Sequence, residues 1–290
     1  MCRNARWNAS PYFVFVLVAS SGLCACSSSN PSVAQSGATE PCGSALFCDD
    51  FDTYTAGNAP AGAWSSSQNG GSVAVDTTHV HSAPNAVKIT AAAATGYRSV
   101  MLVLQNAQFL PTAGNVIYGR MLFWLDSAPQ ETVHWTFIDG QGLVPGQQYH
   151  AIYRYGGQIP ITQTGVFVGS QMLASYDTPD SYDTPAVGPS SDCWLHSDMK
   201  PVPVATWSCA EWKFDGAANS MQFWLDGVEV PDLAMNGTGQ GCVNQAMTFP
   251  WTAPTFDRLD LGWESYQADD ARAIWIDDVA IGASKLGCPQ

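Results

Sequence analysis

The sequence predicts an all-β protein in which two antiparallel sheets pack face to face as a sandwich or jelly roll. Patterns typical of helices are almost absent, whereas short runs of alternating polar and apolar residues recur along the chain. Gly, Pro, Asn and Asp bound these runs, as turns between strands require. Because no helical segment connects the runs, we expect the strands to pair antiparallel.

The expected strands follow one another from residue 46 to residue 281. One connection, Asp226-Gly227, is a two-residue hairpin signal. In chain order the expected strands are 46–51, 72–76, 86–90, 99–105, 116–125, 132–138, 149–155, 165–168, 207–214, 220–225, 258–266 and 272–281.

The first 25 residues have the pattern of a signal peptide. Arg3 and Arg6 precede an apolar run at 11–19 that is too short for a permanent transmembrane helix. The run is followed by the tetrapeptide LCAC at 23–26, which resembles a bacterial lipoprotein box with Cys26 as the lipidated residue. An ordinary signal peptide cut nearby would instead release the protein. Both alternatives export it, to the outer membrane or the extracellular space, with a lipid anchor as the only expected membrane contact.

Residues 26–41 are small and polar and predict the lipidated cysteine followed by a flexible tether. Residues 42–290 then form a single domain, since β-sandwiches of about 200–250 residues are common. Outside the N-terminal segment an even number of cysteines remains, which predicts three disulfides in an exported protein. Counting alone does not assign their pairing.

The formal net charge of −14 argues against nucleic acid as a partner. The same charge disfavours a highly anionic ligand. Eleven tryptophans and ten tyrosines suit a sheet protein that contacts sugars through ring faces, although a large sandwich core would use the same residues. We therefore expect a monomer that binds a polysaccharide.

A run of aromatic and polar residues at 148–158 is the first place where we expect chemistry. Strand side chains alternate between faces, so His150 and Arg154 share one face, and Gln158 joins them if pairing continues past two glycines. This face could bind a polar ligand. Tyr153 and Tyr155 share the opposite face and could contact a substrate, although half-buried sheet tyrosines give the same pattern.

Two further strands place polar residues opposite an apolar face. In 132–138 the polar face includes His134, and in 258–266 it includes Asp260, Glu264 and Tyr266. Solvated polar faces would show the same alternation. If the polar faces of the three strands line one sheet, the side chains that converge are His134, His150, Arg154, Gln158, Glu264 and Tyr266.

The segment 176–191 predicts a long loop. It begins within Ser175-Tyr-Asp-Thr-Pro179 and contains a near copy, Ser181-Tyr-Asp-Thr-Pro185. Long loops are often functional, and this one could border a cleft. A two-copy repeat is also what a loop that tolerates insertions accumulates, and we favour that interpretation.

Four stretches together resemble a secreted jelly-roll family, that of a cellulose-induced fungal protein and its bacterial relatives, which is related to glucuronan lyases. The resemblance spans nearly all of the expected domain and implies a concanavalin-like jelly roll. The stretches are Cys48-Asp-Asp-Phe-Asp52, Val75-Asp-Thr-Thr-His-Val-His-Ser-Ala-Pro-Asn85, Cys209-Ala-Glu-Trp212, and Leu261-Gly-Trp-Glu-Ser-Tyr266 with Ile274-Trp-Ile-Asp-Asp278.

The resemblance implies a structural calcium ion where the first strand meets the last. Asp52, Ser82, Asn85 and Asp277 match its ligand positions, and oxygen ligands are what Ca²⁺ takes. The resemblance also implies a disulfide between Cys209 and Cys288. The pairs that remain are then Cys42 with Cys48 and Cys193 with Cys242.

The resemblance further implies a cleft whose histidine, arginine and glutamine match His134, Arg154 and Gln158. His150 is offset by two residues from a family histidine, so the sequence departs from the family there. A lyase of this family would cleave a uronic-acid polymer by β-elimination. Arg154, helped by Gln158, would neutralise the substrate carboxylate. His134 and Tyr266, or a strand tyrosine, would serve as base and acid.

Two other functions compete with a lyase. A non-catalytic carbohydrate-binding protein needs only rings and a polar face, and it fits the acidic chain better. A glycoside hydrolase needs two carboxylates; Asp260 and Glu264 share a face, but the Glu-x-Asp-x-x-Glu signature of jelly-roll glucanases is absent. We rank the hydrolase third.

Overall fold

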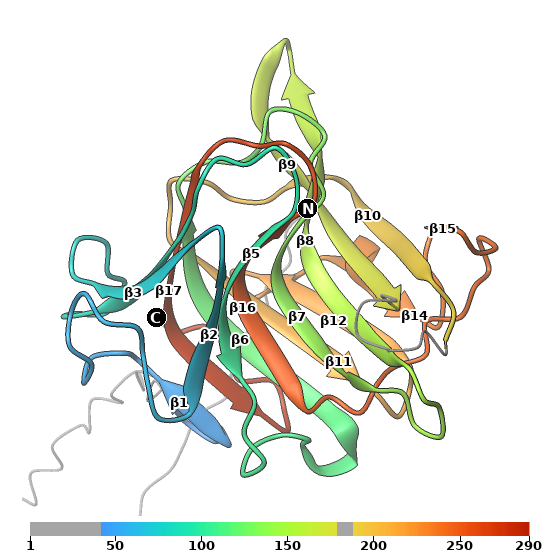
Figure 1. Cartoon of the computed structure of the whole chain (residues 1–290), viewed down its shortest axis with the longest axis horizontal. Coiled ribbons are helices and arrows are strands. Elements are labelled where there is room, and N and C mark those ends of the chain that lie inside the picture. The colour runs from blue at the N-terminus through green and yellow to red at the C-terminus, as the bar shows by residue number, and fades with distance from the viewer. Residues whose placement is uncertain (1–41, 179–187, 290) are drawn as a thin grey trace, which may run out of the picture. The chain divides into compact units, whose positions relative to one another are not determined.

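The alternating runs form two antiparallel sheets that pack face to face in the computed structural model, which describes residues 42–178 and 188–289 (Figure 1). The expected all-β sandwich is therefore confirmed. The expected signal peptide, Cys26, the tether and the second copy of the repeat at 181–185 lie outside the described residues. No helix within the described residues is long and apolar enough to cross a membrane.

One sheet has nine strands and contains the strands near both ends of the described chain. Its order is β13-β12-β11-β6-β17-β4-β3, with β1 beside β17 and β14 beside β12. Its strands are β1 (Phe47–Asp49), β3 (Gly71–Asp76), β4 (Ala86–Ala91), β6 (Val116–Leu125), β11 (Ser208–Asp215), β12 (Ser220–Leu225), β13 (Val228–Glu229), β14 (Met235–Asn236) and β17 (Arg272–Gly282).

The other sheet has eight strands, in the order β15-β10-β9-β8-β7-β16-β5-β2. Two short 3-10 helices, η1 (Ala113–Asn115) and η3 (Pro231–Leu233), lie between strands. The strands of the second sheet are β2 (Trp64–Asn69), β5 (Arg98–Leu104), β7 (Trp135–Leu143), β8 (His150–Gln163), β9 (Val166–Thr178), β10 (Ser191–Pro201), β15 (Gly241–Val243) and β16 (Arg258–Ser265).

The strand boundaries differ from expectation in the second sheet. β9 continues from the expected 165–168 through Thr178, so residues 175–178 of the first copy of the repeat belong to a strand and not to a loop. β2 and β10 were not expected as strands because their runs are rich in polar residues. β2 pairs with β5 at one edge of the sheet, and β10 pairs with β9 and with β15 next to the other edge. Strands at or next to a sheet edge need few apolar side chains.

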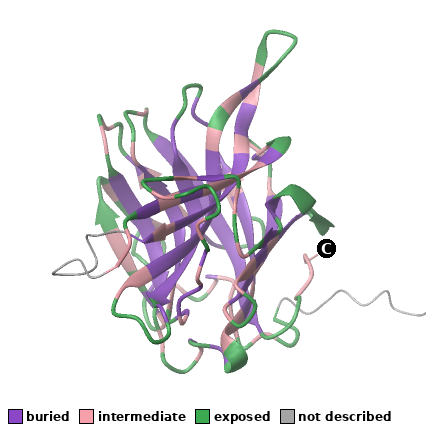
Figure 2. Cartoon of the chain, turned by 90° about the vertical axis from the view of Figure 1, so that its right-hand side faces the viewer, coloured by how far each residue is buried: buried purple, intermediate pink, exposed green. Residues whose placement is uncertain are grey.

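The core lies between the two sheets, where buried residues follow the strands and exposed residues follow the loops (Figure 2). The apolar faces expected in β7 and β16 point into it, and Trp135 stacks on Trp263 with ring centroids 4.6 Å apart. Tyr153 and Tyr155 also lie in this core and are fully buried. Their hydroxyls donate to the backbone carbonyls of Trp251 and Leu233. The prediction that these two tyrosines contact substrate is therefore wrong, because the sheet turns their face inward.

Three disulfides join the six cysteines that lie within the described residues, as predicted. One bridges Cys209 in β11 to Cys288 near the C-terminus, across 79 residues. The others join Cys42 to Cys48 and Cys193 to Cys242. The last pair links directly opposed residues of β10 and β15. Disulfides of this number are typical of exported proteins.

Candidate functional site

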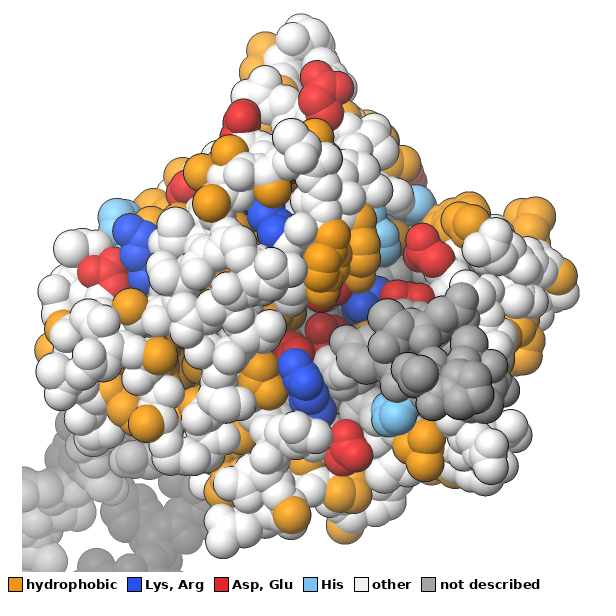
Figure 3. Space-filling model, in the orientation of Figure 1, with side chains coloured by type: hydrophobic (Ala, Val, Ile, Leu, Met, Phe, Trp, Pro, Cys, Tyr) orange, Lys and Arg blue, Asp and Glu red, His pale blue; other side chains and the backbone are white. Residues whose placement is uncertain are grey.

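The outer face of the eight-stranded sheet gathers charged side chains from neighbouring strands. Arg154 in β8 lies opposite Asp139 in β7, and Glu264 in β16 lies opposite Thr136 in β7. Figure 3 shows acidic and basic side chains together in a hollow on the face of the molecule that carries this sheet. Strand alternation therefore brings together polar residues that are far apart in the sequence.

Arg154 is held between two carboxylates at the centre of this face. Its Nη1 donates to Asp177 Oδ2 at 2.7 Å, and its Nη2 lies 3.2 Å from Glu264 Oε1. Only 4% of the residue is exposed. Arg154 thus lies where the sequence placed it, but both terminal nitrogens already bind carboxylates of the protein. A substrate carboxylate would have to compete with Asp177 and Glu264 for it.

Glu264 joins Arg154 to two tyrosines. Tyr266 donates to Glu264 Oε1 at 2.5 Å and Tyr97 donates to Oε2 at 3.0 Å. Burial acts to raise the pKa of Glu264, but Arg154 and the phenol hydrogen bonds outweigh it and hold the pKa below its usual value. Burial and the Glu264 charge raise the pKa of Tyr266 well above its usual value, despite Arg154. At neutral pH Glu264 is therefore ionised and Tyr266 keeps its proton.

His134 packs against Tyr266, with ring centroids 5.1 Å apart and planes inclined by 34°. Its backbone N–H donates to Gln267 Oε1 at 2.7 Å, which fixes the chain at this point. The imidazole Nε2 is buried and has no hydrogen-bond partner among the described residues. Burial, together with the positive charge of Arg154, lowers the pKa of His134 to about 4. The imidazole is therefore neutral at neutral pH.

His134 forms one wall of a pocket of about 320 Å³. Gln158 lies on another wall, where its Oε1 is 2.8 Å from His196 Nε2. In the tautomer that donates from Nε2, His196 fixes the Gln158 amide so that its NH₂ group remains a donor. The lining residues are Thr132, His134, Gln158, Ile159, Leu173, Asp192, Trp194, His196 and Val243.

A second hollow continues from this pocket. It has a volume of about 590 Å³ and shares Ile159 and His196 with the first. The backbone of His196 is held there by Gln240, which accepts from its N–H at 2.9 Å and donates to its carbonyl at 3.1 Å. The two hollows therefore form one continuous depression from β7 to β10.

Five of the six side chains expected to converge do so. His134, Arg154, Glu264 and Tyr266 form one contact network, and Gln158 lines the same pocket as His134. His150 lies opposite Leu143 at the start of β8, four residues before Arg154, and does not line the pocket. His150 therefore lies outside the pocket, and the structure does not support the expected contact between His150 and a substrate.

The sequence did not point to three residues of this site. Asp177 was assigned to a loop, because the repeat that contains it resembles a tolerant insertion. His196 lies in the polar strand β10, and Tyr97 directly precedes β5. A signal was present for His196 only: Asp192, Trp194 and His196 alternate with Cys193 and Leu195, the pattern of a half-buried strand.

Asp260 does not pair with Glu264 in the way a hydrolase requires. Its two carboxylate oxygens each lie 2.7 Å from an Arg258 nitrogen, and Gln141 also donates to it at 3.3 Å. Asp260 lies opposite Asp139, and both are buried. Burial, then the Asp260 charge, raises the pKa of Asp139 well above its usual value. These two carboxylates form a buried pair beneath the face and are not accessible to a sugar.

The four residues expected to bind calcium form two hydrogen-bonded pairs, Ser82 with Asp277 of β17 and Asn85 with Asp52. Ser82 donates from its backbone to Asp277 Oδ2 at 3.0 Å, and Asn85 donates from its backbone to Asp52 Oδ1 at 3.1 Å. Asp277 is fully buried, and burial raises its pKa to about 7. No basic side chain is among the groups that shift the pKa of Asp277. A buried carboxylate of this kind, surrounded by other oxygen atoms, fits a hard cation such as Ca²⁺.

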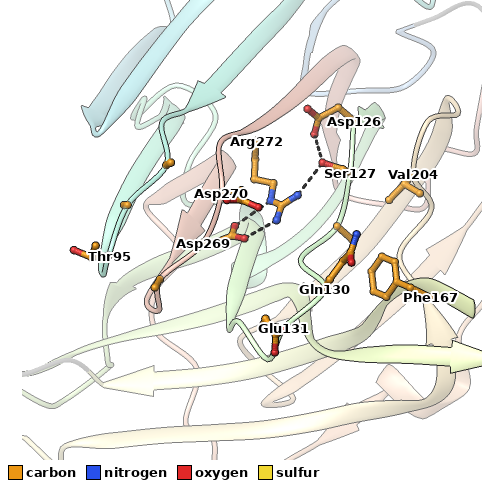
Figure 4. Close-up of a pocket in the computed structure, with 14 residues that line it drawn as sticks. Thr95, Asp126, Ser127, Gln130, Glu131, Phe167, Val204, Asp269, Asp270 and Arg272 are labelled. Atoms are coloured by element: carbon orange, nitrogen blue, oxygen red, sulfur yellow. Dashed lines mark hydrogen bonds and ion pairs between the residues drawn. The ribbon is translucent and has the colours of Figure 1, made fainter. Parts of the chain in front are cut away.

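Another hollow, larger than these two, lies elsewhere between loops (Figure 4). Its volume is about 1240 Å³. Arg272, the basic residue of its lining, points to Asp269 and Ser127 and donates to both. Arg98 binds the same Asp269 at 2.6 Å. These ion pairs tie the loops together, so we assign the candidate site to the His134 pocket.

Comparison with known proteins identifies the family of the chain. Residues 50–284 match the model of a polysaccharide-lyase-like family, described as the Cip1-like core domain. The chain belongs to this family. Family membership supports a carbohydrate-active protein. No curated protein sequence matches the chain.

Two solved structures show the same fold. A cellulose-induced protein, Cip1, is 22% identical, with a TM-score of 0.53 over 83% of this chain and 99% of the other. An endo-β-1,4-glucuronan lyase from the fungus Trichoderma reesei is 14% identical, with a TM-score of 0.53 over 83% of this chain and 96% of the other. At these identities the likeness is one of fold alone. It supports the concanavalin-like jelly roll predicted from the sequence.

Proposed function

We propose that this Cip1-like protein is an exported polysaccharide lyase that cleaves a uronic-acid polymer by β-elimination. The observation that carries the proposal is the packing of a neutral imidazole, which lines the pocket, against a protonated phenol. His134 has a buried, unpartnered Nε2, and Tyr266 beside it retains its proton. A base and an acid in contact, each in the required protonation state at neutral pH, are what elimination needs.

The residue roles follow from these states. His134 Nε2 takes the proton from the carbon alpha to the uronate carboxylate. The electrons of that C–H bond form a carbon–carbon double bond as the bond to the leaving glycosidic oxygen breaks, and Tyr266 gives its hydroxyl proton to that oxygen. The phenolate that forms is stabilised by Arg154, whose guanidinium carbon lies 5.7 Å from the centre of the Tyr266 ring.

Neutralising the substrate carboxylate falls to Gln158 in this arrangement. His196 holds its Oε1, so that the amide NH₂ can donate to the substrate. Arg154 was expected to bind the substrate carboxylate, but Asp177 and Glu264 already bind it. Its contribution to the reaction is therefore indirect. Its charge lowers the pKa of His134 and keeps Glu264 ionised.

The placement of base and acid also constrains the sugar. His134 and Tyr266 pack ring against ring, so the proton and the leaving oxygen would depart from the same face of the sugar ring. In glucuronate and mannuronate these two substituents share a face, whereas in galacturonate they do not. We therefore propose that glucuronan or mannuronate-rich alginate is cleaved and polygalacturonate is not.

The test is the ultraviolet absorbance of the unsaturated product when the purified domain meets each polymer. The expected result is new absorbance with glucuronan or mannuronate-rich alginate and none with polygalacturonate. No product with any of them would exclude the lyase. His134→Gln, which retains a polar side chain without a base, should give no product.

A second function, binding of a neutral polysaccharide without cleavage, is favoured by the charges around Arg154. One arginine faces Asp177 and Glu264 directly, and Asp192 lies on the pocket wall. The chain as a whole carries a formal charge of −14. This field repels a polyanion. Saturable binding to a neutral β-glucan, with no product from any uronate polymer, would support this alternative.

We also propose that Asp52, Ser82, Asn85 and Asp277 hold a structural Ca²⁺. The oxygen donors of this set and the buried Asp277 support the proposal. When bound, the ion would neutralise that carboxylate and join the segment after β1 to β17. It would have no role in the elimination.

A further inference from the structure

A row of side chains crosses the outer face of the eight-stranded sheet at right angles to its strands. Its members lie on or beside the successive strands β5, β16, β7 and β8, and then on β10, which β9 separates from β8. Tyr97 and Tyr266 have ring centroids 5.5 Å apart, and Tyr266 and His134 have centroids 5.1 Å apart. The row ends with Gln158 and His196, which line the pocket and are joined by a hydrogen bond.

Tyr97 begins this row and differs from its other members in exposure. It is 53% exposed, whereas His134 is 7% exposed and Glu264 is 6% exposed. The ring is nevertheless held in place on two sides. Its hydroxyl donates to Glu264 Oε2 at 3.0 Å, and its ring packs on Tyr266 at an angle of 42°. A large apolar surface thus faces solvent in a fixed orientation beside the proposed base and acid.

We propose that Tyr97 is a sugar-stacking subsite of the same cleft, which binds one pyranose ring of the polymer on the β5 side of His134. The inference rests on the proposed function for the location of the cleaved bond. An aromatic face binds the C–H face of a pyranose through apolar contact. A ring that is already oriented loses little conformational entropy on binding. This contact does not depend on the charge of the sugar, so it can bind a polymer in an acidic cleft.

The position of the subsite follows from sheet geometry. Tyr97 directly precedes β5, which is two strands from β7, and His134 directly precedes β7. Neighbouring strands are about 4.8 Å apart, so the two side chains are separated by about 10 Å, on the order of two sugar residues. The polymer would run across the strands, from Tyr97 over His134 toward the depression at His196. The subsite therefore contacts a sugar remote from the bond that is cleaved.

The test measures binding separately from cleavage. In a His134→Gln background, which should not cleave, glucuronan and a neutral β-glucan are titrated against Tyr97→Ala and Tyr97→Phe. Tyr118→Ala is the matched control, because Tyr118 lies in β6 of the other sheet beside Lys213. Thermal melting checks that each variant is folded.

The expected result is that Tyr97→Ala weakens binding of the polymer about tenfold, whereas Tyr97→Phe stays within about twofold. Tyr118→Ala should bind like the background protein. Unchanged affinity in Tyr97→Ala would overturn the subsite, and so would an equal loss in Tyr97→Phe, which would assign the effect to the hydrogen bond with Glu264. If binding depends on Tyr97 but the wild type cleaves no polymer, the proposed lyase activity is wrong and the proposed subsite stands. Absence of binding to both polymers would overturn both.

Discussion

The centroid of the His134 imidazole lies 5.1 Å from that of the Tyr266 ring. The pKa of His134 is lower than usual for a histidine, and the pKa of Tyr266 is higher than usual for a tyrosine. Burial removes the proton from the histidine by lowering its pKa to about 4, and burial also retains the proton on the tyrosine. One cause therefore produces both a base and an acid, because desolvation disfavours the charged form of each. Arg154 reinforces the neutral imidazole through its positive charge.

The buried neutral His134 predicts an acid-sensitive stability. An unfolded histidine binds a proton below about pH 6.5, whereas folded His134 does so only near pH 4. Between these values the unfolded state binds more protons, so stability falls as the pH falls, by about 3 kcal/mol in total. His134→Gln should remove this part of the pH dependence. Urea unfolding of both proteins from pH 7 to pH 4 measures it, and parallel profiles for the two proteins would contradict the assignment.

The ion pairs of Arg154 predict that this residue is needed for the fold as well as for the site. Arg154→Met leaves Asp177 and Glu264 buried without their cation, which should cost about 3–5 kcal/mol. Asp177→Asn added to Arg154→Met should recover part of that loss, because one buried charge is then removed. Denaturant unfolding of the four proteins of this cycle measures the coupling. A loss that is the same with and without Asp177→Asn would show that the pair is not coupled.

Strand alternation explains why much of the site could be predicted. The polar faces of three strands oppose strongly apolar faces, so the alternation of residues shows which side chains point away from the core. These side chains include His134, Arg154, Glu264 and Tyr266. Arg154 and Gln158 are four residues apart in β8 and share its outer face, although the β7–β8 register shifts between Thr136 and Ile138. The resemblance added the proposed calcium ligands and one disulfide, which periodicity does not contain.

The residues that were missed depend on contacts between strands that are distant in the chain. Asp177 is a binding partner of Arg154 only because β9 lies beside β8, and the repeat sequence gives no sign of burial. Tyr153 and Tyr155 were misassigned for the opposite reason. A tyrosine in a strand fits a core or a sugar-binding face equally well, and only the packing of the second sheet shows which face is inside.

The proposed calcium site predicts that chelation lowers the melting temperature. A ligand present at 100 times its dissociation constant adds about 2.7 kcal/mol to stability, which for a domain of this size corresponds to a shift of about 5–10 °C. Scanning calorimetry in 1 mM CaCl₂ and in excess EDTA measures the difference. Asp277→Asn should melt at the same temperature in both solutions. An equal melting temperature for the wild type with and without EDTA would contradict the proposal.

The proton on Tyr266 predicts a variant that separates chemistry from binding. Tyr266→Phe keeps the ring against His134 but removes the proposed donor, so kcat should fall by about 10²–10⁴ with KM nearly unchanged. It also removes one of the two phenol donors to Glu264, and Tyr97→Phe removes the other. Comparing Tyr266→Phe with Tyr97→Phe therefore distinguishes proton donation by Tyr266 from hydrogen bonding to Glu264 as the cause of a lower kcat. If proton donation matters, only Tyr266→Phe loses kcat, whereas equal losses in both variants would mean that the hydrogen bonding of Glu264 controls the rate. Initial rates of unsaturated product formation on glucuronan, with both variants and the wild type, decide between them.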